Sequence, residues 1–201
     1  MVSRCFHRKS LVLLLALSLS GCSFMTGAPG AGANRYYVLT EATDLNEIAR
    51  LPNLRLGVGP IQLPDYLDRL SIASRKDSNR VIYADNERWA ESLGGNVQRI
   101  LAADLSVLLF TERIAQFPWY RTSSPDRRIA IDIQRFEVDP QGKVRLWARW
   151  TLRDESGKRL VSGEFDERRE VASSPDAVAQ AMSALVGDLA RVVAVVVAGS
   201  V

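Results

Sequence analysis

The chain has 201 residues, of which 47% are hydrophobic, and this suits a globular domain with its own core. Its formal charge of +3 comes entirely from residues 1–21, which hold three basic side chains and no acid; the remainder therefore has 26 − 3 = 23 basic and 23 acidic residues. A neutral chain lacks the basic surface that nucleic-acid binding requires. The same 21 residues contain the sole histidine and one of the two cysteines, which excludes Ser-His-Asp and Cys-His catalysis, zinc sites and haem ligation by His or Cys from the rest.

Residues 1–21 are typical of a secretory signal peptide. A short basic segment precedes the nine-residue apolar run Leu11–Leu19, which is too short for a bilayer span of about 20 residues, so a retained membrane anchor is the weaker alternative. The following Leu19-Ser20-Gly21-Cys22 resembles a bacterial lipobox, in which the cysteine is acylated and becomes the first mature residue. Ser23, rather than an aspartate, indicates an outer-membrane lipoprotein facing the periplasm.

Residues 22–34 are expected to be the lipidated cysteine and a flexible tether. The stretch 23–34 is rich in Gly, Ala, Pro and Ser, and its average reach is about 20 Å. With no repeat and no second such stretch, residues 35–201 are predicted to form one domain.

Alternating apolar residues and turn signals predict strands in seven segments. The third and fourth form a hairpin, and the last three form an antiparallel meander with one apolar face and one polar face. The second is expected to end at Gly59-Pro60. The predicted strands are Tyr36–Thr40, Leu54–Val58, Leu70–Ser74, Arg80–Tyr83, Arg128–Val138, Lys143–Arg153 and Arg159–Arg169.

Two helices complete the predicted elements. One covers Ser92–Phe110; the other begins at Ser174-Pro175-Asp176, which supplies a capping serine, a proline and an acid, and ends at Gly199. The valine run 192–197 is too short for a membrane span and is expected to face the core. Asp104 falls on the apolar stripe of the first helix, so we expect an internal partner, most simply an arginine or a hydrogen bond to the end of a strand; a functional role is the alternative.

The sequence offers little for catalysis. None of the three lysines of the mature chain has a serine three residues before it, and the acidic pairs Asp65 with Asp68 and Asp85 with Glu87 lie beside arginines. Gly57-Val58-Gly59-Pro60 lacks the third glycine of a phosphate loop. These observations predict a binding or structural protein without enzymatic activity, metal or cofactor, apart from the covalent lipid.

Several motifs stand in a fixed order behind the lipobox. They are Tyr36-Tyr37-x-Leu39, then Gly57-x-Gly59-Pro60-Ile61-x-Leu63-Pro64-x-Tyr66-Leu67-Asp68-Arg69, then Arg88-Trp89-Ala90-Glu91-Ser92-Leu93 and Leu105-x-x-Leu108-Leu109. Over residues 35–195 this pattern is similar to the PqiC/YmbA family of auxiliary lipoproteins of ABC-type transport systems. Ser92 stands where proline is expected.

The resemblance implies a single α/β domain (an α+β sandwich) with a mixed sheet and helices packed on it. It also implies an accessory component that works with an MCE-domain protein and an ABC permease and ATPase in lipid transport between membranes. A homo-oligomer is compatible with this role. Besides the anchor Cys22, candidate residues for a partner contact are Pro64, Tyr66, Leu67, Arg69 and Trp89, with Trp119 and Trp147 as further exposed aromatics.

Alternatives remain open from the residues alone. Tyr66, Leu67 and Trp89 could instead fasten their loop to the core. The chain could be a lipid carrier or chaperone that itself holds an acyl chain, which would require an apolar cavity of several hundred Å³. An envelope hydrolase is disfavoured by the missing His and Cys.

Overall fold

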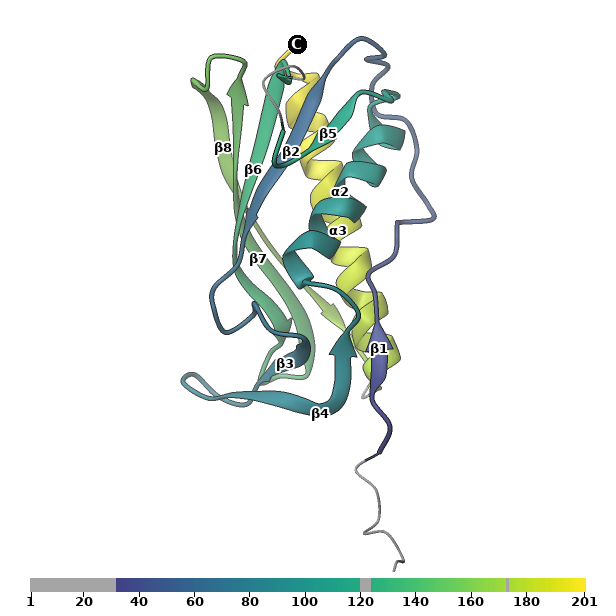
Figure 1. Ribbon diagram of the computed structural model, residues 1–201, viewed down its shortest axis with the longest axis vertical. Coiled ribbons are helices and arrows are strands. Elements are labelled where there is room, and N and C mark those ends of the chain that lie inside the picture. The colour runs from purple at the N-terminus through teal and green to yellow at the C-terminus, as the bar shows by residue number, and fades with distance from the viewer. Residues whose placement is uncertain (1–31, 120–123, 173) are drawn as a thin grey trace, which may run out of the picture. The chain divides into compact units, whose positions relative to one another are not determined.

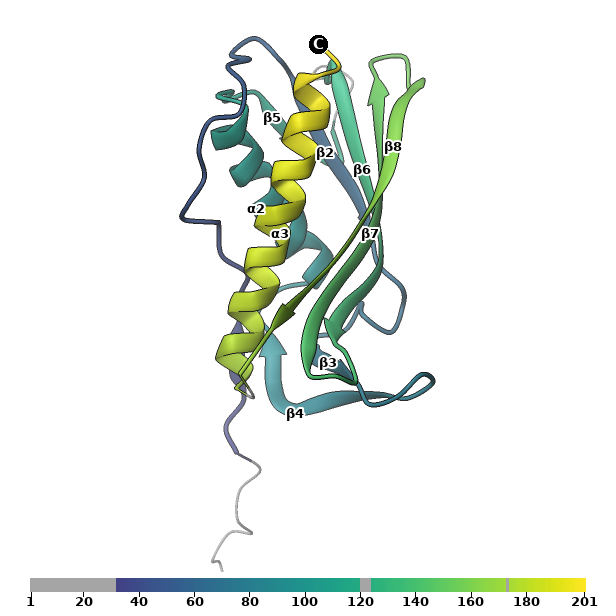
Figure 2. The same cartoon turned by 180° about the vertical axis from the view of Figure 1, so that it is seen from behind.

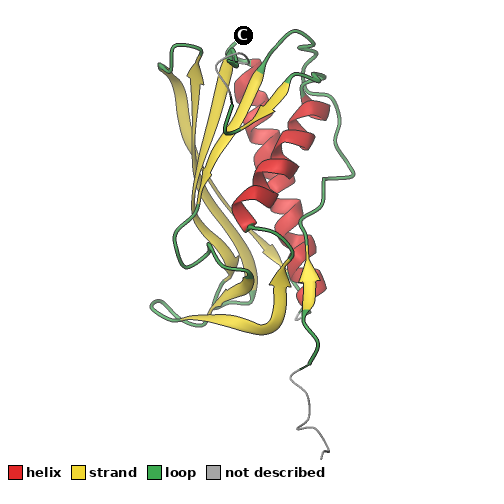
Figure 3. Ribbon diagram, viewed as in Figure 1, coloured by secondary structure: helices red, strands yellow, loops and turns green. Residues whose placement is uncertain are grey.

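The computed structural model describes residues 32–119, 124–172 and 174–201, and residues 34–201 form one compact unit. The predicted signal peptide, Cys22 and most of the predicted tether lie outside the described residues. In the compact unit, two helices lie side by side on one face of a curled, eight-stranded mixed sheet (Figure 1, Figure 2). The helices and strands separate into two layers in Figure 3. The predicted single α+β domain is thus confirmed.

The sheet has the order β1-β4-β3-β6-β2-β5, with β7 and then β8 added beside β6. The central strand β6 pairs in parallel with β2 along its first half and with β3 at its last residue, and antiparallel with β7 along its length. The strands are β1 (Arg35–Tyr37), β2 (Leu56–Gln62), β3 (Ser71–Arg75), β4 (Val81–Trp89), β5 (Ile114–Gln116), β6 (Arg127–Val138), β7 (Lys143–Asp154) and β8 (Arg159–Glu170).

The meander β6–β7–β8 matches its prediction closely, and the β3–β4 hairpin is present with a longer second strand than predicted. In β7 the alternate residues from Val144 to Leu152 are buried toward the helices, because successive side chains of a strand point to opposite faces. Arg145, Trp147 and Arg149 lie on the other face, which we call the outer face of the sheet. No helix covers the outer face in the described residues.

Three predicted strand boundaries are wrong. β2 continues through Gly59-Pro60, where the peptide bond is cis, and ends at Gln62. β4 runs on to Trp89 because it also pairs in parallel with β1, which itself stops at Tyr37. The short strand β5 was not predicted; it lies along β2 by backbone hydrogen bonding that leaves no pattern in three residues.

Both helices begin where their caps predict. α2 (Leu93–Leu108) is capped by Ser92, whose hydroxyl accepts the backbone N–H of Gly95 at 3.3 Å. α3 (Pro175–Ala198) is capped by Ser174, which accepts the N–H of Ala177 at 3.2 Å.

By length and composition alone α3 could cross a membrane. Its apolar stripe is instead buried against the sheet and α2, and Leu185, Val186, Leu189 and Val193 are almost fully enclosed. The prediction of a core-facing helix is therefore confirmed, although Val192 and Val195 of the valine run are exposed.

Candidate functional site

The segment predicted to contact a partner is the connection between β2 and β3, here called the Tyr66 loop (residues 63–70). It makes a tight turn in which the Pro64 carbonyl accepts the backbone N–H of Leu67 at 2.8 Å and of Asp68 at 3.3 Å. Proline restricts the backbone at the start of this turn. The loop thus has a defined conformation in which neighbouring side chains point to different surroundings.

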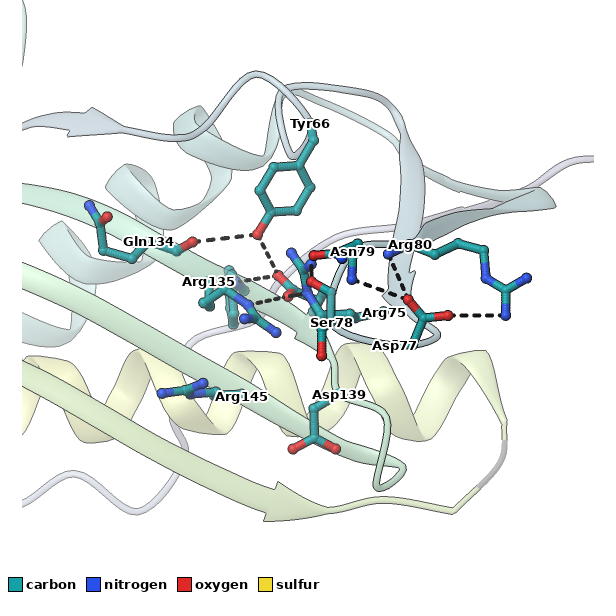
Figure 4. Close-up of polar contacts among 12 residues, drawn as sticks. Tyr66, Arg75, Asp77, Ser78, Asn79, Arg80, Gln134, Arg135, Asp139 and Arg145 are labelled. Atoms are coloured by element: carbon teal, nitrogen blue, oxygen red, sulfur yellow. Dashed lines mark hydrogen bonds and ion pairs between the residues drawn. The ribbon is translucent and has the colours of Figure 1, made fainter.

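Tyr66 fastens the loop to the outer face of the sheet through a buried carboxylate. Its hydroxyl donates to Glu137 Oε2 at 3.0 Å, and Glu137 is only 1% exposed (Figure 4). The other Glu137 oxygen accepts from Arg75 Nε at 3.0 Å and Arg135 Nε at 2.5 Å, and the backbone N–H of Phe136 donates to Oε2 at 3.0 Å. One carboxylate therefore joins the Tyr66 loop, β3 and β6, and its charge is compensated by two guanidinium groups.

A β-bulge in β6 places these groups on one face. The register with β7 shifts between Ile133 and Arg135, so Gln134 is an extra residue without a partner of its own. Apolar residues consequently face inward at Ile133 and again at Phe136, three positions later, while Arg135 and Glu137 both lie outside. Strict alternation would have turned Glu137 into the core.

The surroundings of Tyr66 change its acidity. Burial, followed by the nearby charge of Glu137, raises the pKa of the Tyr66 hydroxyl above its ordinary value of 10.0. The phenol therefore stays protonated and serves as a hydrogen-bond donor at physiological pH. Arg75 also lies over the Tyr66 ring, with its guanidinium carbon 5.4 Å from the ring centroid, which adds a cation–π contact.

Two of the predicted contact residues belong to the core. Leu67 is 3% exposed and Trp89 is 2% exposed, and the Trp89 backbone N–H donates to the Leu70 carbonyl at 2.6 Å. These positions correspond to the alternative interpretation, in which the residues hold the loop in place. Pro64 and Tyr66 are partly buried, and Arg69 is exposed.

An exposed surface nevertheless surrounds Arg69. Its guanidinium carbon lies 5.3 Å from the centroid of the Tyr83 ring, and the Tyr83 hydroxyl donates to the Tyr66 carbonyl at 3.1 Å. Leu70, the next residue of the loop, and Tyr83 are exposed large hydrophobic residues. We call Arg69, Leu70 and Tyr83 the loop surface.

The other exposed-aromatic candidates lie apart from this loop. Trp147 sits on the outer face between Arg145 and Arg149, whose guanidinium carbons are 5.3 and 5.8 Å from its ring centroid. Trp119 packs edge-on against Phe117 with ring centroids 5.2 Å apart. Both aromatics are partly buried by these neighbours.

The expectation of an arginine partner for Asp104 is wrong. Asp104 is 1% exposed and forms no ion pair with the described residues; Oδ1 accepts the backbone N–H of Ala42 at 3.2 Å, and Oδ2 has no hydrogen-bond partner there. Burial raises the pKa of Asp104 to about 6, although the Ala42 hydrogen bond opposes the shift. The nearby Arg191 pairs with Asp44 and Asp188 instead.

The acidic pairs of the sequence do not form a reactive site in the described residues. Glu87 pairs with Arg35 of the adjacent strand β1, and this hydrogen bond lowers the pKa of Glu87. Asp65 and Asp68 are exposed in the Tyr66 loop. No group of three His, Cys, Asp or Glu side chains suited to a metal ion is found among these residues.

Glu137, Arg75 and Tyr83 are not among the site residues predicted from the sequence. A usable signal exists for Glu137, because the spacing of inward apolar residues changes from two to three between Ile133 and Phe136 and indicates a bulge. Arg75 and Tyr83 gave no such signal, since each is an ordinary polar or aromatic residue of a hairpin.

Comparison with known proteins agrees with this architecture. The chain is 25% identical over 180 residues to the intermembrane transport lipoprotein PqiC of Escherichia coli (strain K12) and to that of Shigella flexneri, covering 90% of this chain and 90% of each relative. Among solved structures, a protein from Xanthomonas campestris matches with a TM-score of 0.71 at 17% identity, covering 83% of this chain and 97% of that one. A crystal structure of an uncharacterized protein matches with a TM-score of 0.68 at 18% identity, covering 82% and 99%. These two structures support the fold alone.

The family model of the ABC-type transport auxiliary lipoprotein component matches residues 37–194. This range contains nearly all of the sheet, both helices, the Tyr66 loop and its anchor Glu137. Because the match covers most of the chain and follows the observed elements from β1 to α3, the chain belongs to the ABC-type transport auxiliary lipoprotein family.

Proposed function

We propose that this chain is a periplasmic lipoprotein, anchored in the outer membrane through acylated Cys22, that serves as an accessory subunit of an intermembrane lipid transport system. An MCE-domain protein and an ABC permease with its ATPase would be its partners. The observation that carries the proposal is the family match over residues 37–194, behind a lipobox at Leu19-Ser20-Gly21-Cys22. The relatives named as intermembrane transport lipoproteins support the same role.

The proposed subunit acts by binding rather than by catalysis. Its family is a transport auxiliary family, and the mature sequence has no histidine. The Glu137 carboxylate at the centre of the polar cluster accepts hydrogen bonds from four donors within the protein. Such a cluster holds a loop in place, and its Glu137 carboxylate is not free to act as a general base.

The loop surface is the proposed partner contact. A stacked Arg69–Tyr83 pair with exposed Leu70 offers the aromatic, arginine and aliphatic groups that dominate protein interfaces. Tyr66 and Leu67 fasten the loop to Glu137 and to the core, so the loop is already ordered and little conformational entropy would be lost on binding. A domain with a net charge of zero depends on such short-range contacts.

The alternative of a carrier that encloses an acyl chain has less support. The space between the sheet and the helices is filled by fully buried side chains, including Leu101, Leu105, Val186, Leu189 and Ile131. A carrier would need an apolar cavity of several hundred Å³ at that place.

Two experiments test the proposal. The first is co-purification from membranes of the tagged protein with the MCE-domain protein and the permease. The variant Arg69→Ala with Tyr83→Ala should lose the MCE-domain protein, whereas the matched control Arg159→Ala with Tyr36→Ala, which changes exposed residues of β8 and β1, should retain it. Recovery of the partner at wild-type levels by the first variant would contradict the loop surface as the contact.

The second experiment addresses the anchor. Mass spectrometry of the N-terminal peptide should show an acylated Cys22, and fractionation should place the protein in the outer membrane. An unmodified cysteine, or absence of the MCE-domain protein from the wild-type preparation, would refute the corresponding part of the function.

A further inference from the structure

A hollow on the outer face of the sheet concentrates positive charge. It lies between β2, β6 and β7, has a volume of about 520 Å³ and includes Trp119, Arg128, Asp132, Arg149, Thr151 and Arg153 in its lining. We call it the arginine groove. It occupies the first half of β6, whereas Glu137 and the Tyr66 loop lie at the other end of the same strand.

Two arginines of this groove oppose each other directly. Arg128 of β6 is the register partner of Arg153 of β7, and like charges in that position destabilise a sheet. Neither makes an ion pair with a carboxylate in the described part of the chain: Arg128 donates to Ser124 Oγ at 2.9 Å, and Arg153 donates to the Gly157 carbonyl at 3.0 Å. The Nε of Arg128 is buried and has no hydrogen-bond partner among those residues.

The same opposition occurs elsewhere on this face and is neutralised there. Arg145 of β7 faces Arg168 of β8, but Arg145 pairs with Asp166 at 2.7 Å and Arg168 with Asp139 at 3.5 Å. Within the groove, Arg149 is also provided for: Asp132 is its register partner, and it pairs with Glu164 at 2.9 Å. The opposed pair Arg128 and Arg153 is therefore the part of the groove that has no carboxylate partner in the described residues. An anion bound between Arg128 and Arg153 would provide the missing countercharge and an acceptor for the buried Nε.

The residues around Trp119, at one side of the groove, are closely packed. A Cβ at Gly57 would come within 3.1 Å of the Trp119 ring and 2.6 Å of Pro125, so only glycine at this position lets Trp119 and Pro125 lie against β2. Arg128 in turn lies over Trp119, with its guanidinium carbon 5.7 Å from the ring centroid. The indole thus holds one guanidinium in place and adds an apolar surface beside it.

We propose that the arginine groove binds the phosphate group of a phosphate ester. The guanidinium groups of Arg128 and Arg153, which have no carboxylate partner in the described residues, offer several N–H donors to one anion; a carboxylate presents two acceptor oxygens to them, whereas a phosphate presents at least three. The volume exceeds that of a phosphate alone, and Trp119 would cover the organic part of the ester. The ester comes either from a soluble metabolite or from a phospholipid headgroup; the headgroup source rests on the proposed function, but phosphate binding does not.

The test measures ligand-induced thermal stabilisation of the full, acylated protein in non-ionic detergent. Glycerol 3-phosphate is titrated in one series, phosphatidic acid incorporated in the micelles in a second, and acetate in a third. At least one phosphate ester should raise the melting temperature, and acetate should not. Stabilisation by glycerol 3-phosphate assigns a soluble ester, and stabilisation by phosphatidic acid alone assigns a lipid headgroup.

Variants then locate the site. Arg128→Gln with Arg153→Gln should weaken the apparent affinity at least tenfold, whereas the control Arg145→Gln with Arg168→Gln, which removes the same charge from an opposed pair on the same face, should change it less than threefold. If the double variant does not fold, Arg153→Gln alone serves, because Arg153 contacts only one carbonyl.

Three results would overturn the phosphate site: no stabilisation by either ester, equal stabilisation by acetate, or equal loss of affinity in the groove and control variants. None of them depends on the MCE-domain protein. Loss of partner recovery with intact phosphate binding would therefore refute the proposed function and leave the groove assignment standing.

Discussion

Replacing Asp104 by asparagine should change the free energy of unfolding in a pH-dependent way. The stability of the variant, relative to that of the wild type, should be higher at neutral pH than at acid pH. In the fold, burial raises the pKa of Asp104 to about 6, against an ordinary value of 3.8. A difference of about two pKa units corresponds to about 3 kcal/mol between the protonated and ionised forms. The ionised carboxylate is the costly form, because Oδ2 has no hydrogen-bond partner in the described residues and no arginine pairs with it.

The sign follows from proton linkage. Between about pH 4 and pH 6 the folded chain holds the Asp104 proton while the unfolded chain has lost it. The contribution of Asp104 is therefore most favourable below pH 4 and is lost as the pH rises through about 6. The amide of Asp104→Asn can still accept the Ala42 N–H, but it carries no charge at any pH. The stability of the variant minus that of the wild type should rise by about 2–3 kcal/mol between pH 4 and pH 7.5.

The assay is urea-induced unfolding at half-unit pH intervals from 4 to 8. The control is Asp85→Asn, an exposed aspartate of β4, for which the difference from wild type should change by less than about 0.5 kcal/mol over the range. A flat profile for Asp104→Asn would refute the reasoning. A difference that falls with rising pH would show instead that Asp104 is ionised and paired in the folded protein.

Three further outcomes are expected. Cys22→Ser should release the protein from membranes in cell fractionation while its circular dichroism spectrum stays that of the wild type; retention in the membrane would refute the lipid anchor. Leu67→Ala should cost about 2–4 kcal/mol in urea unfolding because it empties a buried site, whereas Tyr66→Phe should cost about 1 kcal/mol for one hydrogen bond. Equal effects of the two would contradict their different burial. Glu137→Gln should cost about 3–5 kcal/mol, because it leaves Arg75 beside a buried neutral group, and a loss below 1 kcal/mol would mean that the cluster is dispensable.

The elements that were predicted well carry strong local signals. β6, β7 and β8 are each 12 residues long, β7 alternates regularly between buried and more exposed residues, and tight turns separate the three strands clearly. The helices were found from capping serines and one apolar stripe each. In these cases the local pattern and the tertiary environment require the same conformation.

The errors occur where pairing partners are distant in sequence. β1 and β4 are joined by a parallel register between Arg35 and Glu87, and this contact, rather than the residues themselves, extends β4 to Trp89. The three residues of β5 are too few to show a period. No spacing in the sequence revealed that Trp89 would be buried or that Asp104 would meet a backbone N–H from a loop 62 residues away.

The candidate site was predicted in part. The proline and aromatic residues of the Tyr66 loop identify it in the sequence, but they do not show which of its side chains are buried and which are exposed. Leu67 faces the core, Tyr66 reaches a carboxylate 71 residues later in the chain, and Arg69 is exposed to solvent. Neighbouring residues of one loop thus face three environments, and only the packed structure distinguishes them.

The extra residue of β6 also determines where this strand can change its length. Because Gln134 has no register partner, deleting it would leave Ile133 opposite Ala148 and Arg135 opposite Trp147, with both faces of the sheet unchanged. A deletion at Ala130 would instead exchange the inner and outer side chains along one arm of the strand. Single-residue gaps between related chains should therefore accumulate at Gln134 and be excluded from the rest of β6, which makes the bulge a landmark for aligning distant members of the family.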